Sequence, residues 1–525
     1  MTPIRALALV LALTLSGNTL HADETTVKSK IVAVDLFKNG LAVVKREVTL
    51  GKPGAYVIED VPSPVHGTFW IESAGTVDTL VQTREVEVPA NETTPGNLQE
   101  DLAGKKVTLT FKGEKRAPIV GTMMAMKSAK QDEIVHPGRY LIIQTAKGRV
   151  YVDSNEVGSI EADDAGDKVK RRQPRLVLTL GATEKAETKV VIRYLTHGLS
   201  WAASYKIDIT DPKSLTLEQH AIVKNELADL EGAEVRLISG FPSVQFSNVR
   251  SLLSPGTTMA GFFQELSGGV ARMVDFASNS VMTQNPVGNY SRGGFNVAIG
   301  AIPTGEGVDL HYQSIGKRSL KDGDTLAMTV GKGKADYERI VEWLIPDTRN
   351  EYGSHDGRGR GGDDDDAWDA LKFKNPLAYP MTTGPALVTA NGLFNGQRST
   401  YWVNAGEETV LRVGKALSIR TRSIENEQSV KDGSREFIWV GGRQFRKSTV
   451  EGEIAVSNHR NETVQMVIRR RFSGELTRAD GSPKSSLREE GVFSINKRYE
   501  LVWSLPLKAG EEQRFKYSYT VLVPY

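Results

Sequence analysis

Short runs that alternate hydrophobic and polar positions recur along most of this chain. The clearest group lies between residues 189 and 242, where Gly, Asp and Pro separate runs rich in β-branched and aromatic side chains. A period of two residues, bounded by turn formers, is typical of β-strands. We therefore predict four strands in series, at residues 190–195, 205–209, 217–223 and 234–238.

Two large aromatic residues stand at the bend between the first two of these strands. Trp201 and Tyr205 are four residues apart, so their rings are placed to fill the end of a β-sandwich core. A ligand platform is the alternative, because aromatic rings also bind ligands. We interpret the pair as part of the core.

The residues before this group contain two further sets of predicted strands. Residues 30–100 are expected to form a small antiparallel sheet of their own, which begins with a hairpin at Asn39-Gly40. Residues 101–165 contain five short runs separated by glycine-containing turns, a pattern that suits a small SH3-like or Sm-like barrel. The five runs of this barrel-like module lie at residues 106–111, 119–126, 140–145, 149–153 and 157–161. Residues 168–173 (KVKRRQ), which follow the module, are expected to be a basic linker.

Residues 174–525 return to alternation and predict a large β-sandwich region with two disordered insertions. Residues 253–307 are dominated by Gly, Ser, Asn and Met, and only a short amphipathic helix near residues 264–275 is expected there. This insertion either loops out between strands or is an arm that becomes ordered on a partner. Residues 350–370 form the second insertion. The apolar positions of the helix expected in the first insertion are Phe262, Phe263, Met273 and Phe276. The predicted fold class is therefore all-β, with several domains.

The first residues and the composition indicate export. Residues 1–22 have the features of a secretory signal peptide, with Arg5 before an apolar run and small residues near Ala22. That run is too short to span a membrane, and no later run approaches the roughly 20 residues needed. The chain has no cysteine, which excludes disulfides, thiol catalysis and thiolate metal sites. We expect an exported, soluble protein, periplasmic or extracellular, without a transmembrane segment.

The charge balance argues against nucleic acid as a partner. Lys and Arg number 66 and Asp and Glu number 64, for a net charge of +2. The lysines of the barrel-like module are not interleaved with aromatic residues, so this module is expected to be a spacer or a protein-contact unit. Basic residues are dense at positions 469–471 and at Arg443, Arg446 and Lys447. They either form a weak anion-facing surface, for lipid phosphates or acidic glycans, or decorate solvent-exposed faces.

The sequence carries none of the motifs that mark common catalytic or metal sites. It has no G-x-S-x-G, no H-E-x-x-H and no P-loop, and its eight histidines are scattered. His220 and Glu218 lie on one predicted strand and supply only two ligands, so a metal site there needs further ligands from other segments. The four aspartates at residues 363–366 lack the spacing of a calcium loop and are expected to be solvated. Spacing does not reveal whether distant carboxylates meet in space. We therefore predict no catalytic, cofactor-binding or metal-binding residues.

Several motifs resemble one family of exported bacterial proteins. They are Y-x6-W-x3-Y at Tyr194, Trp201 and Tyr205, the strand-ending Asn225, and V-x-L-x-[ST]-G-x-P at residues 235–242. Together they look like the family of unknown function that includes the mucoidy-inhibitor-A-like proteins, and the likeness extends loosely over most of the chain. Many members carry a long coiled coil after the N-terminal module, and this chain has none. The resemblance implies a β-rich fold and an envelope location, and it names no activity.

These patterns favour an exported, non-enzymatic envelope or extracellular protein. Its expected role is to contact an unknown protein or envelope component through sandwich surfaces and the insertion at residues 253–307. Two other classes stay open. One is a hydrolase that acts on envelope polymers with carboxylates from different sheets, and the other is a calcium-assisted adhesin that uses residues 363–366. The patterns name no cofactor and no oligomeric state.

Overall fold

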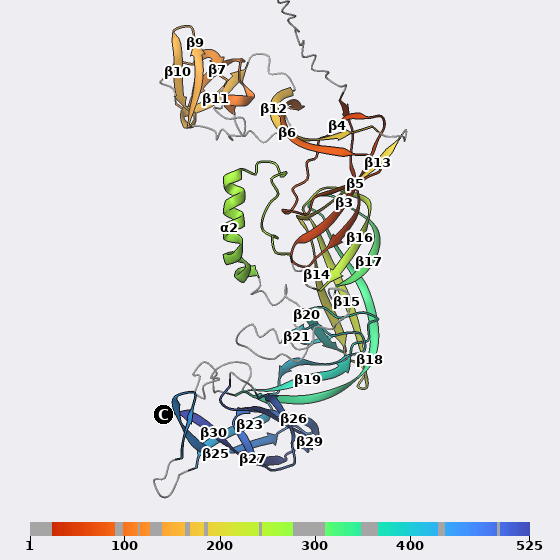
Figure 1. The fold of residues 1–525 in the computed structure, drawn as a ribbon, viewed down its shortest axis with the longest axis vertical. Helices are drawn as coiled ribbons and strands as arrows, with labels where there is room; N and C mark the ends of the chain where they lie inside the picture. The colour runs from red at the N-terminus through yellow and green to blue at the C-terminus, as the bar shows by residue number, and fades with distance from the viewer. Residues whose placement is uncertain are drawn as a thin grey trace, which may run out of the picture.

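The protein is an all-β chain of several domains, as predicted. The computed structural model describes residues 24–89, 98–113, 116–125, 139–162, 168–182, 187–240, 244–276, 310–347, 366–428, 436–490 and 494–525. Figure 1 shows an elongated, bent molecule with a small unit at one end and the C-terminal strands at the other. The expected signal peptide, residues 1–22, lies outside the described residues.

The small unit at one end corresponds to the predicted barrel-like module. Its five antiparallel strands lie in the order β10-β9-β8-β7-β11 around a core that includes Leu109, Met123 and Ile143. Every second residue of these strands points into this core, which is why the alternation located all five. The strands are β7 (Lys106–Phe111), β8 (Ile119–Met123), β9 (Tyr140–Thr145), β10 (Gly148–Asp153) and β11 (Val157–Ala162), with α1 (Leu98–Asp101) before them and η2 (Ser154–Glu156) before β11.

A long two-stranded ribbon joins this module to the rest of the chain (Figure 1). Strands β6 (Val77–Pro89) and β12 (Lys168–Leu180) pair in register over their whole length. The prediction of a basic linker at residues 168–173 is therefore wrong. Arg172 is tolerated in this strand because Glu85 of β6 stands directly opposite it. Strands β4 (Gly54–Ile58) and β1 (Thr25–Thr26) complete this sheet.

The remaining N-terminal strands do not form a sheet of their own, contrary to the expectation for residues 30–100. The hairpin at Asn39-Gly40 is present, with Gly40 at a φ of 85°, but its strands continue into a six-stranded sheet with much later segments. The physical reason is the shared core, in which Val44 and Tyr194 are both buried. The order is β17-β16-β2-β3-β13-β5, from β2 (Lys30–Leu36), β3 (Leu41–Leu50), β5 (Trp70–Ser73), β13 (Thr188–His197), β16 (Leu230–Ser239) and β17 (His311–Leu320).

A second sheet packs on this one and completes the middle sandwich. Trp201 and Tyr205 are buried between the layers, where Trp201 Nε1 donates to the Ile238 carbonyl oxygen and Tyr205 Oη donates to that of Thr382. The interpretation of this pair as core is confirmed. The sheet is built from β14 (Leu199–Asp208), β15 (Ser214–Asn225), β20 (Gly384–Ala390), β21 (Leu393–Thr400) and the first half of β18 (Thr325–Ile345).

Strand β18 continues out of the middle sandwich into a second sandwich at the C-terminus (Figure 1). Its second half pairs with β26 and β19, and Trp343 on this half belongs to the C-terminal core. One sheet of this sandwich adds β19 (Ala367–Lys374), β22 (Glu408–Lys415), β26 (Val464–Ser473), β28 (Lys484–Glu489) and β29 (Arg498–Leu507). The facing sheet contains β23 (Ile419–Glu427), β24 (Phe437–Val440), β25 (Arg443–Asn458), β27 (Glu475–Ala479) and β30 (Glu512–Pro524).

Both predicted insertions contain regular structure where they are described. The first includes the helix α2 (Met259–Phe276), longer than the expected short helix, and its residues 277–307 lie outside the described residues. The second ends in strand, because β19 begins at Ala367 and pairs with β18. Residues 350–365 lie outside the described residues.

Three buried asparagines close the strand ends of the two sandwiches in the same way. Each side-chain amide donates to three backbone carbonyls, one in its own turn and two in a distant turn, and its oxygen accepts from the N–H two residues further on. In each distant turn, an acidic side chain also accepts a hydrogen bond from the backbone N–H of the residue three positions earlier. These acidic residues are Asp324, Glu407 and Glu511. The asparagines are Asn225, Asn375 and Asn458, and their distant turns are residues 320–324, 403–407 and 507–511. This repeated corner was not predicted.

Candidate functional site

Helix α2 is fixed to the body of the protein by its first two turns. Thr258 Oγ1 caps the helix by accepting a hydrogen bond from Gly261 N, at 3.1 Å. The Phe262 ring is buried against His66, with 4.8 Å between the ring centroids. Glu265 accepts hydrogen bonds from Arg250 N at 2.9 Å, Nη2 at 2.9 Å and Nε at 3.1 Å. The backbone hydrogen bond from Arg250 is the main reason why the pKa of Glu265 lies below its usual value.

A neighbouring face of the same two turns is apolar and exposed. Met259 is 57% exposed and Phe263 is 55% exposed, and their spacing of four residues places them on one face of the helix. Phe246 and Leu252, on the segment before the helix, are exposed as well. In Figure 1 the helix stands beside the sheets and is not part of either sandwich layer. An anchored helix with an exposed apolar face is a candidate protein-binding surface.

A buried lysine is the next candidate. Lys38 Nζ, in the turn between β2 and β3, donates hydrogen bonds to Thr382 Oγ1 at 3.2 Å and to the Thr383 carbonyl oxygen. Burial lowers the pKa of Lys38 to about 8. An amine with such a pKa beside a hydroxyl is used in catalysis, but Thr382 and Thr383 are fully buried. Since no substrate reaches this hydroxyl, we assign Lys38 a structural role as a link between the turn and the segment before β20.

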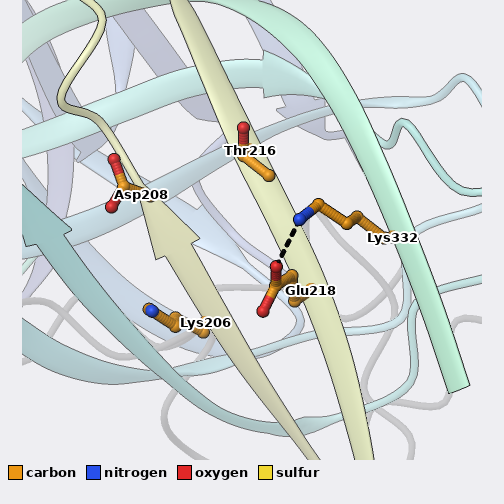
Figure 2. A pocket seen from close by; sticks show the side chains of 5 residues that line it. All are labelled: Lys206, Asp208, Thr216, Glu218 and Lys332. Carbon is orange, nitrogen blue, oxygen red and sulfur yellow. Dashed lines mark hydrogen bonds and ion pairs between the residues drawn. The ribbon is translucent and has the colours of Figure 1, made fainter. Parts of the chain in front are cut away.

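The charged hollow in Figure 2 lies across β14, β15 and β18. Lys332 Nζ contacts Glu218 Oε1 at 2.6 Å, and this ion pair lowers the pKa of Glu218. The pKa of Asp208 is also lowered, mainly by hydrogen bonding to Thr210. Both carboxyl groups therefore stay ionised at neutral pH, whereas a general acid needs a raised pKa. The lining residues are Lys206, Asp208, Thr216, Glu218 and Lys332.

In the part of the chain that the structure describes, the buried acids that a hydrolase would use are not gathered at one place. Among the described residues the buried acids are Asp35 and Glu342, on different sheets. Arg236 holds Asp35 with bonds of 2.5 and 2.8 Å, and two other arginines hold Glu342. Each acid is thus matched by a cation and does not face a second carboxylate across a cleft.

The residues considered as metal ligands do not meet in the described part of the chain. His220 Nε2 lies 3.8 Å from Glu218 Oε2, and no group of three or more His, Asp or Glu side chains is placed there to hold a metal ion. Of the four aspartates, Asp366 contacts Lys415 Nζ at 2.6 Å, and residues 363–365 lie outside the described residues.

The basic cluster at residues 469–471 divides between two faces of β26. Arg470 is buried, where its guanidinium contacts Glu425 and Tyr517 Oη, while Arg469 and Arg471 lie on the opposite face. In the second basic group, Arg446 contacts Glu427 at 2.8 Å and Lys447 contacts Glu436 at 3.3 Å. Spacing alone did not reveal these partners, since they come from other segments of the chain.

No family model matches the chain, and no curated protein matches it. Two residues of the α2 surface, Phe262 and Phe263, were predicted from the sequence as apolar positions of a helix. The contacts that anchor the helix, made by Arg250, Glu265 and His66, were missed because contacts between a helix and distant loops leave no periodic signal.

Proposed function

We propose that this chain is an exported, non-enzymatic protein of the cell envelope or the extracellular space that binds a protein partner through α2. The observation that carries the proposal is that two neighbouring faces of one helix have different environments. Phe262 and Glu265 fix the helix, and Met259 and Phe263 remain exposed on it. A pre-ordered apolar face lowers the entropic cost of binding.

A protein groove is a better partner for this helix than an anionic lipid surface. The charged residues of α2 are Glu265, Arg272 and Asp275, so the helix lacks the basic face that favours binding to anionic membranes. Met259 and Phe263 have the i, i+4 spacing of the anchors that an amphipathic helix inserts into a hydrophobic groove. No helix in the described residues is long and apolar enough to cross a membrane.

Export itself is supported by the sequence. The proposal relies on the signal-like residues 1–22, the lack of cysteine and the resemblance to the mucoidy-inhibitor-A-like family. The hydrolase and the calcium-assisted adhesin stay as alternatives, and no contact among the described residues favours either.

The test compares partner capture by matched surface variants. The mature protein (residues 23–525), Met259→Ser/Phe263→Ser and the control Leu417→Ser are immobilised and exposed to envelope extracts. Leu417 is 75% exposed outside the helix, so the control removes similar apolar surface elsewhere. We expect one protein to bind the wild type and the control and to be lost by the double variant, with the loss reproduced using the purified partner.

Two results would contradict the proposal. Retention of the same partner by the double variant would remove α2 from the interaction. Absence of any partner, together with turnover of an envelope polysaccharide or peptide by the purified protein, would favour the hydrolase. Circular dichroism of each variant checks that the fold is intact.

A further inference from the structure

The inner face of the C-terminal sandwich continues beyond the part that its facing sheet covers. On β30, Val521 is buried in the core and Val523 packs partly against it, whereas Tyr525, on the same side of the strand, is 78% exposed. The backbone N–H of Tyr525 donates to the Gln444 carbonyl oxygen at 3.3 Å, so strand pairing extends to this residue. In Figure 1 this place lies beside the label C, next to β25 and β30.

The short strand β24 adds two further aromatic rings to the open end of this face. The Phe437 ring meets the Tyr525 ring edge-on, with 5.0 Å between the centroids, so both rings lie on the same face. Trp439, two residues further along β24, lies on this face as well and is 68% exposed. Trp439 stands directly opposite Gln444 of β25.

The hairpin that carries these rings is fixed by its turn and by its other face. Gly441 and Gly442 have φ values of 57° and 78°, and a two-residue type I′ turn requires positive φ at both positions. Phe445 points to the opposite face of β25 and is 1% exposed. The exposed rings are therefore held in place before any ligand binds, which lowers the entropic cost of binding.

Polar side chains lie among the rings, and their charges are matched. Gln444 stands between Trp439 and Tyr525 in one row across the sheet, which places the two rings about 10 Å apart, two strand spacings. In the next row Arg446 Nη1 contacts Glu427 Oε1 at 2.8 Å, and its Nη2 donates to Oε2 at 3.3 Å. The surface thus combines apolar rings with hydrogen-bonding groups and carries no excess charge.

We propose that Phe437, Trp439, Gln444 and Tyr525, the aromatic platform, bind a neutral glycan chain. A sugar ring has an apolar C–H face, which packs on an aromatic ring, and hydroxyl groups at its edge, which hydrogen-bond to an amide. The row from Trp439 to Tyr525 offers one extended chain a ring at each end and an amide between them. The matched charges favour a neutral glycan over an acidic one.

A lipid surface fits the aromatic platform less well than a glycan does. The Gln444 amide and the Arg446–Glu427 ion pair would lose water in hydrocarbon without gaining hydrogen-bond partners, and this costs free energy. Hydroxyl groups of a sugar replace that water. The platform is separate from α2, so it adds a glycan contact to the proposed protein contact.

Isothermal titration with two soluble oligosaccharides tests the aromatic platform on the mature protein (residues 23–525). Cellohexaose, a glucose polymer, and chitohexaose, an N-acetylglucosamine polymer, are titrated into the wild type, Trp439→Ala, Tyr525→Ala and the control Trp70→Ala. Trp70 is also 68% exposed and lies on β5 of the middle sandwich, so the control removes the same ring elsewhere. At least one oligosaccharide should bind the wild type and the control equally, and each platform variant about tenfold more weakly, the size of one lost aromatic contact.

Gln444→Leu distinguishes a glycan from an apolar ligand. Leucine keeps the apolar surface but removes the amide, so oligosaccharide affinity should fall several-fold, whereas binding of a purely apolar ligand would be unchanged or stronger. Met259→Ser/Phe263→Ser should bind the oligosaccharide as the wild type does, because α2 is not part of the platform. Failure of this proposal is thus separable from failure of the α2 proposal. Circular dichroism checks that each variant is folded.

The proposal is overturned if the wild type binds neither oligosaccharide at millimolar concentration, or if Trp439→Ala and Trp70→Ala bind them equally. In the first case, two further measurements identify what covers the aromatic platform instead. A dimer that sedimentation velocity detects for the wild type and not for Trp439→Ala would assign the face to a second copy of the chain. Sedimentation with phosphatidylcholine vesicles that Trp439→Ala loses would assign it to lipid.

Discussion

The buried asparagines show how single residues determine where strands of this fold end. Asn458 is fully buried, and its amide joins its own turn, at Glu462, to a turn almost fifty residues away, at Leu507 and Lys508. Because the donors and acceptors of the amide are all satisfied, it works as a polar cross-link in an otherwise apolar sandwich. The Asn225 in the family-like motif has the same contacts, which gives a physical reason for an asparagine at that place.

Replacement of one of these asparagines should therefore be costly. Asn458→Ala removes four hydrogen bonds of a fully buried amide, three to backbone carbonyls and one from the N–H of Arg460, so we expect a loss of about 3 kcal/mol or more in the free energy of unfolding. Denaturant unfolding of the C-terminal sandwich, followed by tryptophan fluorescence, measures this loss. Asn395→Ala, at an exposed asparagine with one weak 3.4 Å hydrogen bond, is the control. Equal stability of both variants would refute the cross-link.

Lys38 predicts a specific dependence of stability on pH. Its pKa is about 8 in the folded protein, against an ordinary value of 10.5. Between these values the unfolded chain binds more protons than the folded one, so this group makes stability rise with pH. We expect the free energy of unfolding of the wild type to increase relative to Lys38→Met by about 3 kcal/mol from pH 8 to pH 10.5. Tyrosines that titrate in the same pH range contribute equally to both proteins, so their effect cancels when one free energy of unfolding is subtracted from the other. A flat difference would show that the Lys38 amine is not desolvated.

At the level of elements, local alternation identified the strands better than it identified their partners. The strand at Tyr205 was predicted because one of its faces is buried, but β14 begins at Leu199 and also contains Trp201, which was expected at a bend. The hairpin at Asn39-Gly40 was predicted because its turn chemistry is local. By contrast, β27 and β28 were missed, since their residues are mostly exposed and polar (ELTRA and KSSLRE) and give no period of two. Solvent-facing edge strands lack the burial that creates the pattern.

Long-range pairing and the candidate surfaces depend on contacts that sequence spacing does not contain. Strand β3 pairs with β13 well over one hundred residues later, and both were predicted as strands of separate units. In the same way, the basic run at residues 469–471 was recognised, but its division between Glu425 on one side and Glu500 on the other follows from the pleat of β26 and from strands around it. The sequence indicated where charge is dense, and only the fold shows which acidic side chains pair with it.

At the level of the whole molecule, the chain is a series of units with separate cores. The barrel-like module has a core of its own, with Leu109 and Ile143 at its centre, and no residue of this core belongs to the sandwich cores. The two sandwiches, in contrast, share β18, which contributes residues to both sheets. The module, in contrast, is joined through the ribbon of β6 and β12, and only the far end of β12 enters the middle core, with Leu176, Leu178 and Leu180. The other end of the ribbon is therefore the point at which the module can be removed.

This difference predicts that the module can be excised without harm to the sandwiches. Pro89 and Lys168 stand directly opposite at the end of the ribbon, so replacement of residues 90–167 by Asn-Gly closes β6 and β12 with a two-residue hairpin turn. We expect the calorimetric unfolding temperature of the sandwiches to be unchanged. A matched variant that also removes Lys168 forces a one-residue slip of the register, which exchanges the two faces of a strand. This variant should have a lower unfolding temperature.

The outcomes of the excision distinguish the roles of the module. If the first variant fails to unfold cooperatively, the module is an integral part of the core. If it folds and still captures the α2 partner, the module is a spacer, and loss of capture by a folded variant would make it a contact unit.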